Sequence, residues 1–122
     1  MWGGMDRRRF PRANYPCLIK IHKKKEPEEF LTQTENIGCG GVCVILEKRL
    51  ALFEDVALEI DLKDNSKPVA TDGKAVWVVE HREPRKESQF DTGIEFARLK
   101  REDYQRIEKI VQICGQKEES TP

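Results

Sequence analysis

Hydrophobic and polar side chains alternate along most of the chain, and this pattern predicts six β-strands. A period of two is typical of a strand that buries one face and exposes the other. The pattern is clearest in residues 55–62, where Val56, Leu58 and Ile60 face inward and acidic residues face outward. Strands are predicted at residues 15–22, 30–35, 42–46, 55–62, 69–80 and 90–96. Residues 47–54 are ambiguous and leave room for one helical turn.

The pattern changes to a helical period in residues 100–114. Apolar residues recur there at spacings of three and four, with charged residues between them, as on a helix that buries one face. Gly115 is expected to end this helix. Six short strands followed by one helix predict an antiparallel β-barrel that the helix partly covers. The chain is expected to divide into a flexible start (1–6), one domain (7–114) and a flexible tail (115–122).

Two short segments carry the residue types best suited to bind a ligand. The segment Arg7–Arg12 has four arginines in six residues. Their planar paired donors suit phosphate and the Hoogsteen edge of guanine. The segment Gly38–Gly41 has three glycines in four residues, between two predicted strands. Turn geometry explains one or two of these glycines, and a third indicates that another group approaches the backbone closely.

The overall charge limits the kind of ligand. The chain of 122 residues has 22 basic and 22 acidic side chains, so its formal net charge is zero. A general nucleic-acid binder usually carries a marked basic excess. Basic charge is instead concentrated locally, at residues 7–12 and 23–25, which favours a small anionic ligand. Binding of single-stranded nucleic acid ranks lower, because the outward strand positions are often acidic.

The sequence predicts a cytoplasmic protein without metal or catalytic groups. No apolar run approaches the length of a bilayer span, and no apolar stretch follows the N-terminal arginines as in a secretory signal. The four cysteines are therefore expected to stay reduced. Cys39 and Cys43 are four residues apart, but the other cysteines and the two histidines are scattered, so no metal site is expected. No catalytic motif is visible, and we expect no enzymatic activity.

In their order and separation the two segments resemble the motifs of the PilZ domain, a bacterial receptor module for cyclic di-GMP (c-di-GMP). That family has an Arg-x-x-x-Arg element, followed about two strands later by Asp/Asn-x-Ser-x-x-Gly. Arg8 and Arg12 match the first element. Asn36, Gly38 and Gly41 align with the second.

The resemblance covers roughly residues 6–114, because residues 73–77 and 93–96 also look like later strands of the family. It implies a PilZ-like, split-barrel type of fold with c-di-GMP lying across the barrel surface. It also implies that Arg8 and Arg12 clamp phosphates and guanine edges. By the same resemblance, Asn36 bonds the ligand or fixes the turn, and Gly41 lets the turn pass close to the ligand. Further candidate contacts are Arg7, Arg9, Gly40 and Trp77.

Two of these further candidates can also be explained without a ligand. Trp77 lies on an alternating strand, where aromatic side chains usually pack within the fold rather than against a ligand. Gly40 is explained by backbone conformation alone.

Gly38 departs from the family pattern, which has serine at this position. A hydrogen bond to a charged partner contributes about 1.5–3 kcal/mol, so its loss lowers affinity roughly ten- to a hundredfold. A water molecule in the place of the hydroxyl would make the loss smaller. Two functions therefore stay open. One is a c-di-GMP receptor whose Arg loop orders on binding and signals to a partner protein. The other is a protein-interaction adaptor of the same fold that has lost nucleotide binding.

Overall fold

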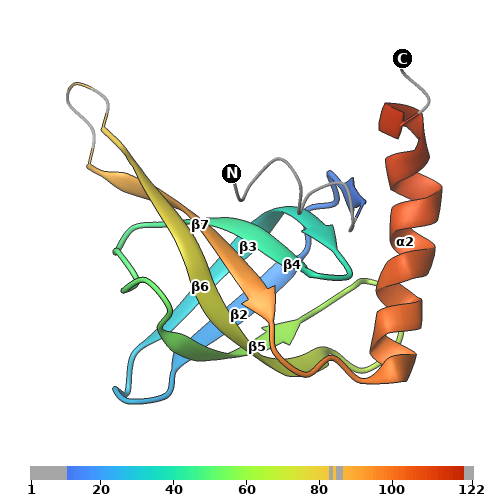
Figure 1. Ribbon diagram of the computed structural model, residues 1–122, viewed down its shortest axis with the longest axis horizontal. Helices are drawn as coiled ribbons and strands as arrows, with labels where there is room; N and C mark the ends of the chain where they lie inside the picture. Colours follow the sequence, from blue (N-terminus) through green and yellow to red (C-terminus); the bar gives the residue numbers. More distant parts are fainter. Residues whose placement is uncertain (1–10, 83, 85–86, 120–122) are drawn as a thin grey trace.

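The computed structural model describes residues 11–82, 84 and 87–119. Its strands form one antiparallel sheet in the order β1-β3-β2-β5-β6-β7-β4, and β3 also pairs with β4. Strands β2 to β7 therefore close into a six-stranded barrel, with the helix α2 beside one end (Figure 1). This confirms the predicted barrel with a C-terminal helix. The elements are β1 (Arg12–Ala13), β2 (Leu18–Lys23), β3 (Glu29–Gly38), β4 (Gly41–Leu46), β5 (Asp55–Ile60), β6 (Val69–His81), β7 (Gln89–Phe96) and α2 (Arg101–Glu119).

The residues that alternation placed on the inward faces form the core of the barrel. Their neighbours on the strands, such as Lys20 and Glu59, are exposed and lie opposite each other on β2 and β5. The helix closes the core with Ile107 and Val111. The most buried strand residues include Ile19, Ile21, Ile37, Val42, Val44, Val56, Ile60 and Ile94.

Strand β3 is longer than the sequence pattern predicts. It continues to Gly38 instead of ending near residue 35, so Asn36 and Gly38 lie on a strand and only Cys39 and Gly40 connect it to β4. The reason is pairing that alternation does not reveal: β4 pairs with Asn36 and Ile37, and the two-residue strand β1 pairs with Ile37 and Gly38. An irregularity in the β3–β4 register between residues 34 and 36 interrupts the alternation at the same place.

The predicted end of the helix is wrong, and the structure settles the ambiguous residues 47–54. The helix does not end at Gly115 but continues to Glu119. A glycine inside a helix costs only about 1 kcal/mol relative to alanine, and the glutamine, lysine and glutamates that follow favour a helix. Residues 47–54 contain a turn and no helix; Phe53 has a positive φ of 67° there.

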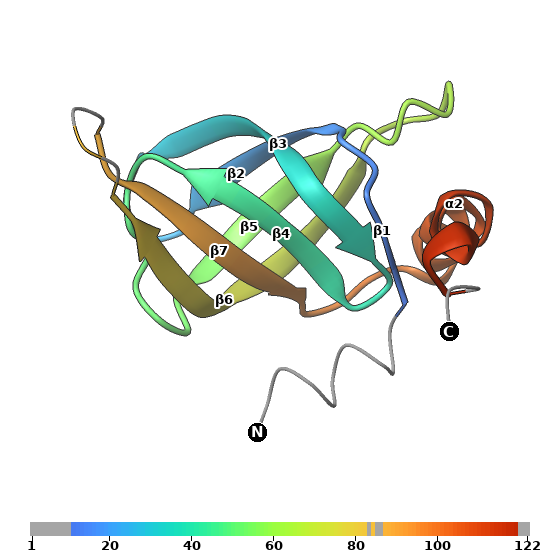
Figure 2. The same ribbon diagram turned by 90° about the horizontal axis from the view of Figure 1, so that it is seen from above.

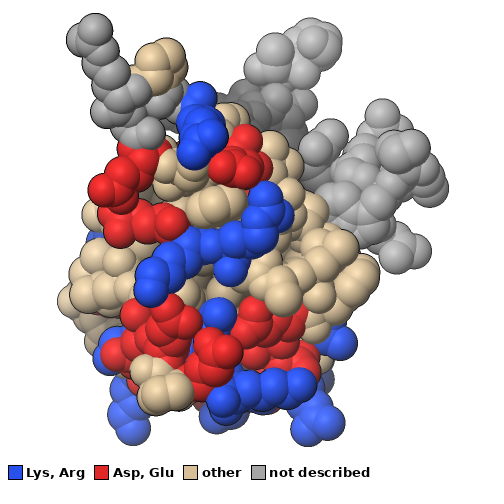
Figure 3. Space-filling view, turned by 90° about the vertical axis from the view of Figure 1, so that its left-hand side faces the viewer, with Lys and Arg blue, Asp and Glu red and all other residues tan. Residues whose placement is uncertain are grey.

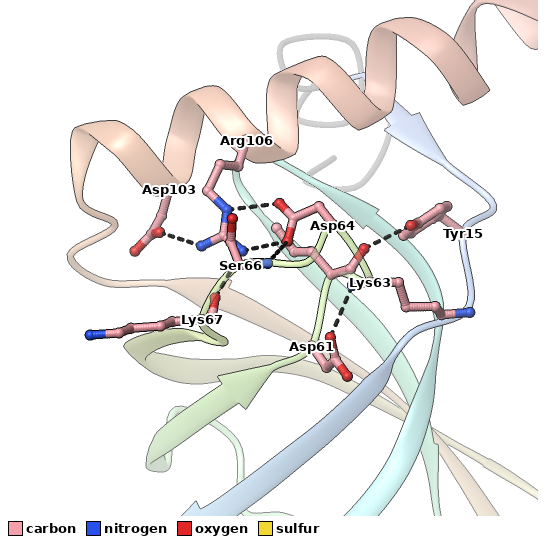
Figure 4. Close-up of polar contacts among 9 residues, drawn as sticks. Tyr15, Asp61, Lys63, Asp64, Ser66, Lys67, Asp103 and Arg106 are labelled. Carbon is pink, nitrogen blue, oxygen red and sulfur yellow. Dashed lines mark hydrogen bonds and ion pairs between the residues drawn. The ribbon is translucent and has the colours of Figure 1, made fainter.

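Helix α2 is attached to the loop between β5 and β6 by Arg106 (Figure 4). The Arg106 guanidinium donates two hydrogen bonds to the Asp64 carboxylate, at 2.8 and 2.9 Å, and one to the carbonyl of Lys67 at 2.8 Å. It also bonds Asp103 on the same helix at 3.0 Å. These bonds hold the pKa of Asp64 below its ordinary value. The helix fixed in this way also contacts β1 and β3, which carry candidate site residues.

Candidate functional site

Arg12 and Asn36, one from each segment singled out in the sequence, lie side by side. Arg12 is on β1 and pairs with Gly38 of β3. Its Nη1 donates a hydrogen bond to Oδ1 of Asn36 at 2.9 Å, and both residues are half-buried. Figure 2 shows β1 running along the end of β3, between the barrel and α2. The fold thus joins two residues that are 24 positions apart in the sequence.

From Asn36 a row of residues crosses the outer surface of the neighbouring strands. Asn36 of β3 pairs with Cys43 of β4, and Cys43 pairs with Gly93 of β7. Gly93 in turn pairs with Trp77 of β6. Residues paired across strands point to the same face of a sheet. This row faces outward, because the residues next to it along the strands are buried in the core: Ile37, Val42, Val44, Thr92 and Ile94.

Trp77 lies directly against the backbone of Gly93. A Cβ added to Gly93 would collide with the indole atoms Nε1 and Cε2. Trp77 is nevertheless only half-buried, so part of its ring is exposed at the far end of the row. The packing role of Trp77 is therefore visible in the fold.

Gly38 and Gly41 lack a side chain where another backbone approaches them. A Cβ on Gly41 would collide with the carbonyl oxygen of Ile94 on β7. A Cβ on Gly38 would lie 2.7 Å from the carbonyl oxygen of Pro11. Neither glycine has a positive φ. The close approach that the sequence predicted is confirmed, but the approaching groups belong to the protein itself, and turn geometry does not explain these two glycines.

Cys43, in the middle of the row, is held as a neutral thiol. Its side chain is nearly inaccessible, with 8% of the residue exposed. Burial and, after it, the Asp91 carboxylate raise the pKa of Cys43 from 9.0 to about 11, although Arg12 acts in the opposite direction. A thiol that stays protonated at neutral pH is a poor nucleophile. Asp91 also forms a hydrogen bond of 2.7 Å with Nε2 of His81, so an acidic group borders the row on β7.

The remaining predicted contacts are Arg7, Arg8, Arg9 and Gly40. Arg7, Arg8 and Arg9 lie outside the described residues. Gly40 is in the turn between β3 and β4, where its carbonyl accepts a hydrogen bond from the Phe96 N–H at 2.9 Å. This bond gives Gly40 a structural role.

The second basic stretch, residues 23–25, is largely neutralised by acidic partners. The ammonium group of Lys23 lies 3.4 Å from Glu26 and Glu28 and 3.7 Å from Glu54. Lys24 lies 3.0 Å from a carboxylate oxygen of Asp72. Figure 3 shows the loop-bearing face of the barrel, where basic and acidic side chains interleave. Polyanion-binding surfaces usually carry a basic excess, whereas both signs of charge occur among the described residues of this face.

Sequence reasoning missed two members of the row, Cys43 and Gly93. The sequence marks Cys43 only as a cysteine four residues from Cys39, and Gly93 only as part of the strand predicted at residues 90–96. Alternation in residues 90–96 places Gly93 on the face opposite Thr92 and Ile94, but residues 42–46 are all apolar and give no such signal for Cys43. The strand register that aligns Cys43 and Gly93 with Asn36 and Trp77 could not be derived from the sequence.

Within residues 11–82, 84 and 87–119, no group of three or more His, Cys, Asp or Glu side chains is placed to hold a metal ion. Among these residues, too, no helix combines the length and the apolar character that crossing a membrane requires.

Solved structures with this fold include several PilZ proteins. The PilZ domain of YcgR from Escherichia coli, determined with c-di-GMP, has a TM-score of 0.69 and 14% identity, covering 93% of this chain and 95% of that chain. The inhibitor of motility MotI/DgrA from Bacillus subtilis has a TM-score of 0.68 and 22% identity, over 95% of this chain and 53% of that chain. MrkH from K. pneumonia, in complex with c-di-GMP, has a TM-score of 0.65 and 22% identity, over 87% of this chain and 51% of that chain.

These similarities establish the fold. The chain spans about half the length of the MotI/DgrA and MrkH chains. No curated protein matches this sequence. The family model of the PilZ domain matches residues 6–112, which includes the Arg segment, the glycine segment, all strands and most of α2. The chain therefore belongs to the PilZ domain family.

Proposed function

We propose that this protein is a non-enzymatic receptor for c-di-GMP. The observation that carries the proposal is the hydrogen bond between Arg12 and Asn36, which unites the two motif elements at one end of the outer row. An arginine oriented by an amide oxygen presents a planar set of donors in a fixed direction. The membership of the PilZ family and the c-di-GMP complexes of YcgR and MrkH support the choice of ligand.

In the proposed complex the ligand lies over the row from Arg12 to Trp77. Arg8 and Arg12 bind phosphate oxygens and guanine edges, and Asn36 holds Arg12 or bonds the ligand directly. The exposed part of Trp77 offers an aromatic surface to a guanine at the other end of the row. Arg7 and Arg9 are auxiliary contacts from the same segment. Gly38, Gly40 and Gly41 keep the backbone at this end free of side chains.

The same proposal includes a route for the signal. Residues 11–13 are already attached to β3, so ordering on binding is assigned to the arginines that precede them. Segments that order around a ligand change the surface that a partner protein meets. Here that surface includes α2, which contacts both β1 and β3. We expect amide hydrogen exchange of residues 6–10 to slow with saturating c-di-GMP; exchange that the ligand leaves unchanged would exclude this switching step.

A second function is favoured by one observation, the absence of the motif serine at Gly38. On this alternative the chain is a protein-interaction adaptor with a PilZ fold that no longer binds the nucleotide. The adaptor predicts an unchanged melting temperature in excess c-di-GMP, whereas a receptor must be stabilised by mass action.

Calorimetric titration with c-di-GMP tests the proposal. We expect the wild-type chain to bind at micromolar concentration or below, and the Arg8→Ala/Arg12→Ala double variant to lose binding. The matched control is Lys48→Ala/Arg49→Ala, which removes two positive charges at the loops on the opposite side of the barrel, where they pair with Glu28 and Glu80. Equal loss in both variants would indicate a non-specific charge effect. Binding that survives in the Arg8/Arg12 variant would place the site elsewhere, and no binding by the wild type would favour the adaptor.

A further inference from the structure

We infer that Gly38 is a positioning residue: it lets the segment Pro11–Arg12 lie directly against β3 and so holds Arg12 on Asn36 before any ligand arrives. This inference rests on the proposed function and deepens it. It also changes the meaning of the missing serine. This chain lacks the serine hydroxyl, but the segment Pro11–Arg12, here called the arm, packs closely against β3. This packing preserves binding.

The contact leaves no room for a side chain at position 38. A Cβ there would lie 2.7 Å from the Pro11 carbonyl oxygen and 3.2 Å from Cγ of Arg12. The nearer atom belongs to the backbone, so it cannot turn away as the tip of a flexible side chain can. Gly38 itself is buried beneath this segment. A serine or an alanine would therefore have to displace the arm.

The arm has little freedom to yield. Ala13, the residue after Arg12, is fully buried in the core and pairs with Ile37 of β3. Helix α2 contacts β1 from the other side. Moving Pro11 away from position 38 would tilt β1 about the anchored Ala13. The Arg12 side chain would then leave Oδ1 of Asn36, to which it now donates a bond of 2.9 Å.

The benefit of the close packing is preorganisation. A binding group that is already oriented loses less conformational freedom when the ligand binds. The hydroxyl of the family serine would add a contact to the ligand, but at this position in this chain it would disturb the arginine. The two effects oppose each other. Of the two effects, we expect the loss of close packing to exceed the gain of a hydroxyl contact, because the added Cβ would overlap with a backbone atom.

The inference predicts the effects of Gly38→Ser and Gly38→Ala. Both variants carry the Cβ, and only the first carries the hydroxyl. Without ligand, we expect both to speed amide hydrogen exchange in residues 12–13 and 37–38 while the exchange of β5 and β6 stays unchanged. With c-di-GMP, we expect both to weaken binding roughly tenfold, in the range for a lost charged hydrogen bond. Gln33→Ala, an exposed position on β3 that pairs with β2, serves as the control with wild-type exchange and affinity.

A double-mutant cycle with Arg12→Ala separates positioning from a general defect. If Gly38 acts through Arg12, adding Gly38→Ser to Arg12→Ala lowers affinity no further, because the interaction is already lost. Additive losses would overturn the inference, and so would a Gly38→Ser variant that binds more tightly than wild type with unchanged exchange at β1. The exchange measurement needs no ligand, so it decides the packing claim even if the wild-type chain fails to bind c-di-GMP and the proposed function falls.

Discussion

At the end of the barrel beside α2, backbones approach one another closely where glycines leave no side chain. At the opposite end, loops are joined by ion pairs, most of them exposed, with those of Lys23 partly buried. The first end contains Gly38 and Gly41, packed against the carbonyl groups of Pro11 and Ile94. The opposite end, on the left of Figure 1 and facing the viewer in Figure 3, carries charged side chains on the loops between strands. One example is Lys48, whose ammonium group lies 2.9 Å from Glu28.

This difference indicates which end of the barrel tolerates substitutions. Close-packed backbone cannot accommodate even one methyl group without a shift, and the shift is transmitted to whatever the backbone carries. Exposed ion pairs contribute little, since water and salt screen them. The end with the glycines therefore places Arg12 and Asn36 accurately, whereas exposed ion pairs at the loop end contribute less to stability. The following predictions test this contrast, from the largest expected effect to the smallest.

Gly41→Ala is expected to have the largest effect on stability. Its Cβ would collide with the Ile94 carbonyl oxygen of the β7 backbone. We expect the free energy of unfolding, measured by urea titration, to fall by roughly 3 kcal/mol. Gly93→Ala is the comparison, because its Cβ meets the Trp77 indole, which can turn aside. We expect a smaller loss and altered Trp77 fluorescence, recorded in a Trp2→Phe background. A Gly41→Ala protein as stable as wild type would remove the basis of the contrast.

The Cys43 thiol, in the middle of the row, makes the free energy of unfolding depend on pH in the alkaline range. Burial and Asp91 raise the pKa of Cys43 from 9.0 to about 11 in the folded protein. The folded state therefore favours the neutral thiol. This contribution is fully present below pH 9 and is lost as the pH rises through about 11. We expect a loss of roughly 1–2 kcal/mol over this interval.

The measurement is urea unfolding at both ends of the interval, for wild type and for Cys43→Ala. The variant should lose less stability over the interval than the wild type does. The change with pH is compared, not the absolute stability, because the substitution also removes packing. Parallel pH dependence in the two proteins would show that Cys43 is not the group responsible.

Arg106→Ala tests the attachment of α2. This attachment also depends on charged groups, but they are partly buried and joined by several hydrogen bonds. The variant loses the paired bonds to Asp64 and the bond to the Lys67 carbonyl. We expect a loss of about 1 kcal/mol at neutral pH. Lys109→Ala, an exposed position on the same helix, is the control and should stay near wild type.

The same variant should change the response to acid. Hydrogen bonds from Arg106 lower the pKa of Asp64 from its ordinary value of 3.8. Their contribution is present above that value and is lost as the pH falls through the lower pKa of the folded protein. Unfolding curves of Arg106→Ala should therefore depend less on pH in this acidic range. Equal acid dependence in both proteins would contradict the assignment.

Lys48→Ala is expected to have the smallest effect. The Lys48 side chain is 69% exposed, although its ion pair with Glu28 is short at 2.9 Å. We expect the free energy of unfolding to change by less than about 0.5 kcal/mol, and less still in high salt. A loss as large as that of Arg106→Ala would mean that the loop end is held more firmly than its exposure indicates.

Local sequence was enough to predict most of the barrel. Alternation around Ile19, Ile21 and Val56 identified the inward faces, because successive side chains of a strand point to opposite sides. The helical period around Ile107 identified the face of α2 that packs on the barrel. The wrong strand boundaries lie where pairing with a segment distant in the sequence decides the conformation. Strand β3 continues through Asn36 to Gly38 because β4 pairs with Asn36 and β1 pairs with Gly38.

The candidate site was predicted in part. Arg12 and Asn36 were selected from motif order, and the fold brings them into contact. The roles assigned to Arg8 and to the ligand contacts stay predictions. The glycines show the limit most clearly: their spacing indicated that something approaches the backbone, and only the fold shows that Pro11 and Ile94 do so.

The sequence by itself determined which residues face the core, where the helix lies and which side chains suit an anionic ligand, since these depend on neighbours along the chain. The tertiary structure alone decided the register that aligns Asn36, Cys43, Gly93 and Trp77 across separate strands. It also decided that position 38 has no room for a side chain. The physical reason is that barrel closure and close packing depend on pairs of segments far apart in sequence, and no local pattern records the distance between them.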